Sequence, residues 1–332
     1  MCPSHRRAEK KRRRRGAFSQ KAPLRTSPQR PPYCPRGANM NRREFVQSVA
    51  ASVLAAHALP SLAGEAAAKP SATDRIQLGN TKVRPTRLGI GTGTNGGNIQ
   101  RSLGQEGFAK LVRHAWDRGV RYIDTAGNYN MHALVKKAIE GLPREELVIL
   151  TKVWLSQGLD VPKTLERFRQ ELGTDYFDVT LLHCVMKPTW PDDLRKHRDD
   201  LSAAKEKGLV RAVGVSTHGM PGLTQIAGCE WVEVALLRMN HSGAHMDGPT
   251  GKWAEKVDHE AAVAEIRKVK AAGKGVLGMK LVGNGDFTNA EDRQKAVQFV
   301  FGNKLADAVT IGCKSPAEVD EALDNITRAL NA

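Results

Sequence analysis

Polar residues that ionise or form hydrogen bonds stand at the ends of successive short apolar runs. Asp124 ends the run that begins at Val120, and Lys152 and His183 end the next two runs. Ser216 and Asn240 follow the two runs after those. Aspartate, lysine and histidine are side chains that enzymes use to hold or transfer protons. If the runs are neighbouring parallel strands, these residues share one edge and could form an active site.

The apolar runs alternate with amphipathic stretches at the spacing of repeated βα units. Predicted strands occupy 86–91, 120–125, 147–152, 177–183, 209–215, 231–239, 274–279 and 308–312. Predicted helices occupy 105–117, 131–141, 162–172, 192–207, 221–227, 258–272, 290–302 and 316–330. Eight such units in about 250 residues favour an α/β fold that is a single (β/α)8 TIM barrel. A short β-hairpin at 75–83 precedes it, with a turn at Gly79-Asn80.

An open, doubly wound sheet is the structural alternative. Such sheets usually carry a G-x-G-x-x-G turn after the first strand. Here the first predicted strand is followed by Gly91-Thr-Gly-Thr-Asn-Gly-Gly97, which does not have that spacing. The barrel is therefore the preferred prediction.

Most of the chain's positive charge lies before the predicted barrel. The 332 residues carry a net charge of +16, but residues 1–43 contain 14 Lys and Arg and one acid. Residues 69–332, the predicted barrel domain, carry only +5. This mild charge does not favour a nucleic-acid partner. Residues 1–39 are rich in Arg, Pro and Ser, which predicts a disordered basic extension outside the native product, with Met40 as the start.

Residues 40–68 have the three-part order of an export signal. The basic pair Arg42-Arg43 and Phe45 precede an Ala/Val/Leu-rich run over 46–63, and Ala66-Ala-Ala68 offers a cleavage site. The pair resembles a twin-arginine signal. No run of 18 apolar residues occurs, so we expect no stable membrane anchor. We expect transient contact with the twin-arginine machinery and a periplasmic or secreted product, or a cytoplasmic one if the leader is not functional.

The predicted barrel resembles the aldo-keto reductase superfamily, with matching motifs in order from about residue 75 to 330. Asp124-Thr-Ala-Gly-Asn-Tyr129 resembles the family's D-T-A-x-x-Y, Thr151-Lys152 its T-K, Leu181-Leu-His183 its L-x-H, and Gly214-Val-Ser216 its G-V-S. The resemblance implies hydride transfer between a nicotinamide nucleotide and a small carbonyl or alcohol.

The resemblance also implies four catalytic residues. Tyr129 would give a proton to the substrate oxygen, and His183 would hold that oxygen by a hydrogen bond. Lys152 would lie beside Tyr129 and lower its pKa, because a nearby cation favours the anionic phenolate. Asp124 would pair with Lys152. Trp154 stands where a pocket aromatic is common, and it is expected to shape the substrate site.

The expected cofactor is NADP, with NAD also accepted. The resemblance places the nucleotide along residues from four strand ends: Gly91, Thr92, Ser216, Thr217, Met279, Lys280, Gly283, Gly285, Lys314, Ser315 and Glu318. Ser315-Pro-Ala-Glu318 is equally typical of a capping box, a structural use. An acid at 318 also disfavours a 2′-phosphate, so a preference for NADP over NAD does not follow from this segment.

Two other interpretations stay open. Leu236, Met279 and Glu318 depart from the usual family residues, which leaves a nucleotide-binding barrel with a sensing or scaffolding role as the alternative. His241, His245 and Asp247 could suggest a metal site. Polar residues on such a loop are more often solvated, so we predict no metal.

Overall fold

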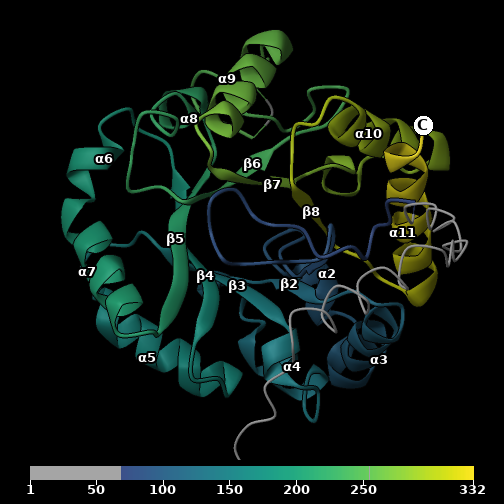
Figure 1. Ribbon diagram of the computed structural model, residues 1–332, viewed down its shortest axis with the longest axis horizontal. Helices are drawn as coiled ribbons and strands as arrows, with labels where there is room; N and C mark the ends of the chain where they lie inside the picture. The colour runs from purple at the N-terminus through teal and green to yellow at the C-terminus, as the bar shows by residue number, and fades with distance from the viewer. Residues whose placement is uncertain (1–68, 254) are drawn as a thin grey trace, which may run out of the picture. The chain divides into compact units, whose positions relative to one another are not determined.

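A computed structural model describes residues 69–253 and 255–332; the extension at 1–39 and the export signal at 40–68 lie outside the described residues. Eight parallel strands close into a barrel in chain order, which confirms the predicted TIM barrel (Figure 1). The strands are β1 Leu88–Gly91, β2 Tyr122–Asp124, β3 Val148–Trp154, β4 Phe177–Val185, β5 Val210–Thr217, β6 Val234–Arg238, β7 Gly275–Met279 and β8 Ala308–Ile311.

Helices surround the strands, as Figure 1 shows. The α-helices are α2 Asn98–Arg101, α3 Gly104–Asp117, α4 His132–Ala138, α5 Val161–Leu172, α6 Trp190–Asp193, α7 Arg195–Glu206, α8 Met220–Leu223, α9 His259–Ala271, α10 Ala290–Gly302 and α11 Pro316–Leu330. Short 3₁₀ turns are η1 Gly127–Tyr129, η2 Arg144–Glu146 and η3 Gly283–Gly285.

Most predicted helices occur within a few residues of their expected bounds. The helix predicted at 221–227 is shorter, because α8 ends at Leu223. The helix predicted at 192–207 is divided at Leu194 into α6 and α7. None of the described helices is long and apolar enough to cross a lipid bilayer.

The strands bury apolar side chains on both faces, because a parallel barrel is covered inside and outside. Leu150 and Leu181 belong to the cluster inside the barrel, whereas Ile149 and Leu182 belong to the larger cluster between strands and helices. Successive residues of a strand point to opposite faces, which explains this alternation. The apolar faces of the amphipathic helices thus pack on the outer face of the barrel, as their pattern predicts.

The predicted N-terminal hairpin forms, although without regular strands. The N–H of Leu78 donates to the carbonyl of Val83 at 3.1 Å, and one antiparallel bridge joins Arg75 and Thr86. Pro85 has no N–H to donate, which limits the ladder. Leu78 and Val83 are buried in the cluster inside the barrel, so the hairpin closes that core from its amino-terminal end.

A local irregularity in β4 lies directly after His183. The register between β4 and β5 shifts between Leu182 and Val185, and Cys184 has a φ of 67°. The N–H of Cys184 donates to the hydroxyl of Ser216 at 2.9 Å. Because this bond replaces a missing ladder bond, the bulge is stable and can redirect the side chain beside it.

Candidate active site

Asp124 and Lys152 form an ion pair at the carboxyl-terminal ends of β2 and β3. The Nζ of Lys152 donates to Oδ1 of Asp124, and also to the carbonyl of Thr125 at 2.8 Å. Lys152 has no exposed surface, and Asp124 is buried. Burial lowers the pKa of Lys152 and raises the pKa of Asp124, while the charge of each partner opposes the shift of the other. The predicted pairing is therefore present.

Tyr129 lies above this pair, on the turn η1 that follows β2. The Nζ of Lys152 is 4.9 Å from the centroid of the Tyr129 ring. Gly93 makes room for the ring, because a Cβ at that position would lie 2.5 Å from its carbon atoms. The sequence D-T-A-x-x-Y thus places the tyrosine ring next to the cation, as the resemblance implies.

The pKa of Tyr129 differs from the expectation. Burial raises this pKa well above the usual value for tyrosine, and the negative charge of Asp124 raises it further. This net direction is opposite to the one expected from Lys152 alone, because burial dominates; that Lys152 favours the phenolate stays a prediction. Tyr129 consequently keeps its proton at neutral pH, as a proton donor must.

His183 faces Tyr129 from β4. Its Nε2 is 3.4 Å from the Tyr129 hydroxyl, and the two rings are edge to face with centroids 5.5 Å apart. Burial lowers the pKa of His183 well below its usual value, and the charge of Lys152 lowers it further. The imidazole is therefore neutral. Trp154, which is 45% exposed, packs edge to face against His183 at 5.3 Å, where a substrate could contact it.

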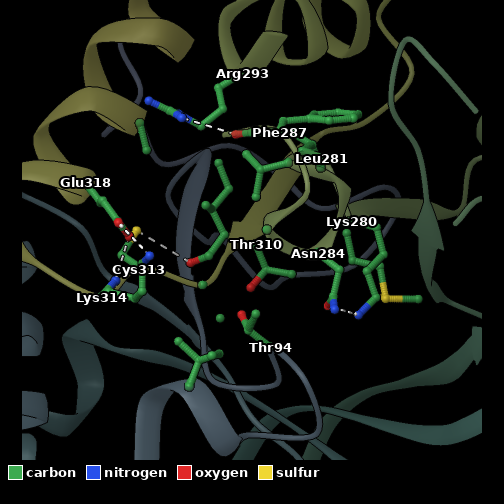
Figure 2. Close-up of a pocket in the computed structure, with 18 of the residues that line it drawn as sticks. Thr94, Lys280, Leu281, Asn284, Phe287, Arg293, Thr310, Cys313, Lys314 and Glu318 are labelled. Atoms are coloured by element: carbon green, nitrogen blue, oxygen red, sulfur yellow. Dashed lines mark hydrogen bonds and ion pairs between the residues drawn. The ribbon is translucent and has the colours of Figure 1, made fainter. Parts of the chain in front are cut away.

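A cavity of about 640 Å³ opens beside these residues. It runs from Asp124 and Tyr129, past the loop after β7, to the beginning of α11. Figure 2 shows the side chains that line it, which come from the ends of β1, β7 and β8 and from α10 and α11. Six of the predicted nucleotide-binding residues line this cavity: Gly91, Met279, Lys280, Gly285, Lys314 and Glu318.

The other five predicted nucleotide-binding residues do not line the cavity. They are Thr92, Ser216, Thr217, Gly283 and Ser315. The hydroxyl of Thr217 donates to the carbonyl of Val185 at 3.0 Å, and that of Ser216 accepts from Cys184. Ser315 caps α11, since its hydroxyl accepts from the N–H of Glu318 at 3.3 Å. Thr92 and Gly283 are buried. The N-cap half of the capping-box interpretation is thus confirmed, whereas the Glu318 carboxylate accepts from the N–H of Lys314 at 2.7 Å instead of Ser315.

Several lining residues carried no signal in the sequence. They include Thr94, Asn284, Phe287, Arg293, Thr310 and Glu321. The position of Thr310 in β8, just before the predicted Lys314, could have indicated it. Arg293 and Glu321 form a two-point ion pair between α10 and α11, with Nη2–Oε2 at 2.9 Å. That pairing depends on helix packing, which no local motif encodes.

The cavity has the polarity that a nicotinamide dinucleotide requires. The hydroxyl of Thr310 is buried on the wall, close enough to Asp124 to favour its charged carboxylate. Lys280 and Lys314 supply positive charge along the same wall. These residues fit a long anionic ligand whose reactive end reaches Tyr129.

The residues considered for a metal site do not converge. The Nε2 of His245 is 2.6 Å from Asp286, and Asp247 lies instead beside Arg238. His241 is 4.0 Å from Asp292. In residues 69–253 and 255–332, no group of three or more His, Cys, Asp or Glu side chains has the geometry of a metal site.

Comparisons with known proteins agree with this geometry. The chain is 38% identical over 120 residues to methylglyoxal reductase DkgB of Escherichia coli O157:H7, covering 33% of this chain and 42% of that protein. It is 28% identical over 213 residues to methylglyoxal reductase DkgA of Yersinia pestis, covering 62% of this chain and 71% of that protein. The chain thus matches about two fifths of the length of the first of these relatives.

A solved structure shares the fold. The aldo-keto reductase of Klebsiella pneumoniae in complex with NADPH superposes with a TM-score of 0.57 at 17% identity, covering 78% of this chain and 90% of that one. The sequence of residues 87–330 matches the Aldo/keto reductase family. This match spans nearly all of the barrel, including the four residues around the Tyr129 hydroxyl, and the chain belongs to the aldo/keto reductase family.

Proposed function

We propose that this protein is an NAD(P)-dependent carbonyl reductase in which Tyr129 donates a proton to the oxygen of an aldehyde or ketone. One observation supports this most strongly. The hydroxyl of Tyr129 and the Nε2 of His183 lie 3.4 Å apart, above the buried Lys152–Asp124 pair and at the end of the cavity. A carbonyl oxygen placed between the two groups could hydrogen-bond to both.

The residues have complementary tasks in this reaction. Reduction places negative charge on the carbonyl oxygen, and groups that point at that charge lower the barrier. A nicotinamide nucleotide, when bound, supplies the hydride. Tyr129 keeps its proton until the oxygen becomes basic, and neutral His183 orients that oxygen. The charge of Lys152 stabilises the phenolate that proton donation leaves, and Asp124 fixes the position of Lys152.

The nucleotide would lie along the cavity, with Met279 near its reactive end and Lys280 and Lys314 near its phosphates. At the end of the cavity away from Tyr129, each cation lies beside a carboxylate. Lys314 is 3.6 Å from Glu318, and Arg293 is paired with Glu321. A 2′-phosphate would compete with both carboxylates. We therefore expect NADPH and NADH to bind with similar affinity. Glu318→Arg should favour NADPH about fivefold, measured by fluorescence titration, because the exchange replaces a repulsion by an exposed ion pair.

The names of the relatives suggest a first substrate to test. Two of them are methylglyoxal reductases, so a small aldehyde with an adjacent carbonyl is a sensible starting compound. Trp154 at the mouth would contact whatever group extends from the carbonyl.

Replacing the proton donor tests the proposal. Tyr129→Phe should retain nucleotide binding and lower the rate of aldehyde reduction about 10²–10⁴-fold, the usual contribution of acid catalysis. Tyr176→Phe is a matched control, because Tyr176 lies at the other end of the barrel, between Arg144 and Arg211. Equal rates for wild type and Tyr129→Phe would exclude Tyr129 as the donor.

A sensing role without turnover is the second candidate. It is favoured by Leu236, which is fully buried inside the barrel and offers no amide to the nucleotide, and by Met279 at the position of a stacking aromatic. A thioether can still pack against a ring face. Turnover of bound nucleotide distinguishes the two candidates.

The location of the protein is a separate proposal, and it rests on residues 40–68, outside the described range. We propose export by the twin-arginine route, which carries folded proteins, with nucleotide bound before crossing. Changing Arg42 and Arg43 together to Lys should retain the full-length chain in the cytoplasm. Mass spectrometry of the mature amino terminus should place it near Lys69. Peptides from residues 1–39 in the mature protein, or unchanged export of the variant, would exclude this route.

A further inference from the structure

A second ion pair is buried at the carboxyl-terminal end of the barrel, outside the Tyr129 site. Arg238 ends β6 and Asp247 lies in the loop that follows, and their exposed fractions are 2% and 1%. The Nε of Arg238 is 3.8 Å from Oδ1 of Asp247, which is beyond hydrogen-bond distance. The pair is therefore held together by charge, without the bonds that usually accompany such burial.

The hydrogen-bonding atoms of this pair lack partners within the described part of the chain. Nε and Nη1 of Arg238 are buried and unbonded, and so are both carboxylate oxygens of Asp247. A buried, unsatisfied charged group is costly, and it calls for a missing partner. Burial also raises the pKa of Asp247 to about 7, so near neutral pH Asp247 neutralises Arg238 only in part. Arg238 is thus a buried cation with unfilled donors.

The surroundings of Arg238 connect it to the substrate side of the site. Its guanidinium carbon is 5.5 Å from the Trp253 ring centroid. Its charge, after burial, lowers the pKa of His218 to about 2. The His218 ring lies edge to face with His183, with centroids 6.3 Å apart. The charges of Arg238, Lys280 and Lys152 thus all act on His218, the neighbour of His183. Arg238, Asp247 and Trp253 do not line the nucleotide cavity.

Exposed apolar side chains lie at the same end of the barrel as this cation. Among the described residues, the large hydrophobic side chains that are exposed are Trp154, Met186 and Trp253, at 45%, 39% and 44%. All three come from segments at the carboxyl-terminal ends of strands, and Met186 contacts the loop that carries Trp253. These exposed side chains suit a ligand that is mainly apolar or aromatic. A guanidinium matches the geometry of a carboxylate, because its donors form a planar fork.

We propose that Arg238 binds a carboxylate on the carbonyl substrate, so that the preferred substrates are apolar or aromatic aldehydes or ketones that carry an acid group. This inference rests on the proposed reductase function for its catalytic part, but anion binding at Arg238 can be measured without turnover. Arg238 acts here as a specificity-determining residue, and Asp247 occupies it weakly when no substrate is present.

Equilibrium binding tests the site directly, with benzoate and the isosteric neutral benzamide as probes in calorimetric titration. Benzoate should bind at least about tenfold more tightly than benzamide, the gain expected from a charge-assisted hydrogen bond. Arg238→Met should abolish that difference, and Arg238→Lys, which keeps the charge, should retain part of it. Arg144→Met is the matched control, because Arg144 is paired with buried Asp178 at the opposite end.

Kinetics then connects the site to catalysis. The ratio of kcat/KM for 4-carboxybenzaldehyde to that for 4-formylbenzamide should fall about tenfold in Arg238→Met. Asp247→Asn should raise the same ratio, because it removes the competing internal carboxylate. A purely structural pair would lower both rates equally in each variant. If Arg238→Met does not fold, Arg238→Lys and Asp247→Asn still give opposite expected shifts.

Three results would overturn the inference. They are equal affinity for benzoate and benzamide, an equal loss of both ligands in Arg238→Met, and a fall in nucleotide affinity as large as the loss of benzoate. The fall in nucleotide affinity would mean that Arg238 contributes to nucleotide binding and not to substrate binding. If neither aldehyde is reduced although benzoate binds through Arg238, the reductase proposal fails and the anion site stands.

Discussion

Buried charged side chains are bonded differently at the two ends of the barrel. At the amino-terminal end, carboxylates at the start of alternate strands are fully bonded. Asp178 accepts the N–H of Ile149 at 2.9 Å and also binds Arg144 and Arg211. Glu233 and Asp307 repeat this arrangement: each accepts a backbone N–H of the preceding strand and pairs with a lysine. Each carboxylate thereby links two strands and an adjoining segment.

At the carboxyl-terminal end, several buried polar atoms lack partners among the described residues. They are the hydroxyl of Thr92, Nε and Nη1 of Arg238, both carboxylate oxygens of Asp247, and Nδ1 of His183. Nε of Arg87, just before β1, and the hydroxyl of Tyr122, the first residue of β2, also lack a hydrogen-bond partner in the described part of the chain. Groups left unsatisfied cost stability and concentrate at sites that bind ligands. The carboxylates at the amino-terminal end therefore stabilise the barrel, whereas Asp247 and Arg238 at the carboxyl-terminal end give up stability, as expected of groups that bind a ligand.

The largest expected effect comes from Lys152, a carboxyl-terminal cation that is fully buried and paired with Asp124. Lys152→Met should reduce activity at least about 10³-fold, because Tyr129 loses the charge that stabilises its phenolate. It should also cost about 3–5 kcal/mol of unfolding free energy, since Asp124 is left buried and unpaired. Urea unfolding and initial rates measure the two losses.

The double variant Asp124→Asn with Lys152→Met is the control for this prediction. It removes both charges, so part of the stability should return while the activity stays low. If Lys152→Met alone were as stable as wild type, Lys152 and Asp124 would not form a stabilising pair.

Asp178 offers the opposite case at the amino-terminal end. Asp178→Asn should cost about 1–3 kcal/mol of unfolding free energy, because bonds to a charged acceptor are lost. The kcat and KM for aldehyde reduction should not change, since Asp178 is remote from Tyr129. A large change in kcat in a variant that folds normally would contradict the claim that the amino-terminal end serves stability and not catalysis.

Lys280 predicts a smaller, pH-dependent effect at the carboxyl-terminal end. Burial, together with the charges of Arg238 and Lys152, lowers its pKa to about 8, and Asp124 opposes the shift. The charged form is therefore present below pH 8 and lost above it. Nucleotide affinity should fall up to about tenfold between pH 7 and 9.5, the value of a charge-assisted bond. Lys280→Met should give a flat profile; a wild-type profile that is equally flat would exclude this role.

The sequence was sufficient for the features that depend on local pattern. The eight strands, the long helices and the strand-end residues Asp124, Lys152 and His183 follow from periodicity and order along the chain. The pairing of Arg238 with Asp247, and of Arg293 with Glu321, depends on how loops and helices fold back, so neither was predicted. The net rise of the Tyr129 pKa was not predicted, because burial and the charge of Asp124, which cause it, depend on the folded chain.

Ser216 shows a further limit of motif reasoning. Its motif indicates a nucleotide contact, whereas its hydroxyl in the structure accepts from Cys184 at the β4 bulge. The same residue can therefore serve the site indirectly, by holding the strand that directs His183. Only the register between β4 and β5 reveals that use.

A single-turnover experiment tests the central claim, that the carboxyl-terminal end performs carbonyl reduction, most directly. Protein saturated with NADPH or NADH is mixed with excess aldehyde in a stopped-flow instrument, and nucleotide absorbance is followed at 340 nm as the usual reporter of hydride loss. The account predicts one equivalent of nucleotide oxidised per site and one of alcohol formed, with the phase slowed about 10²–10⁴-fold in Tyr129→Phe. Bound nucleotide that stays reduced with every aldehyde, neutral or acidic, would contradict it and favour the sensing barrel.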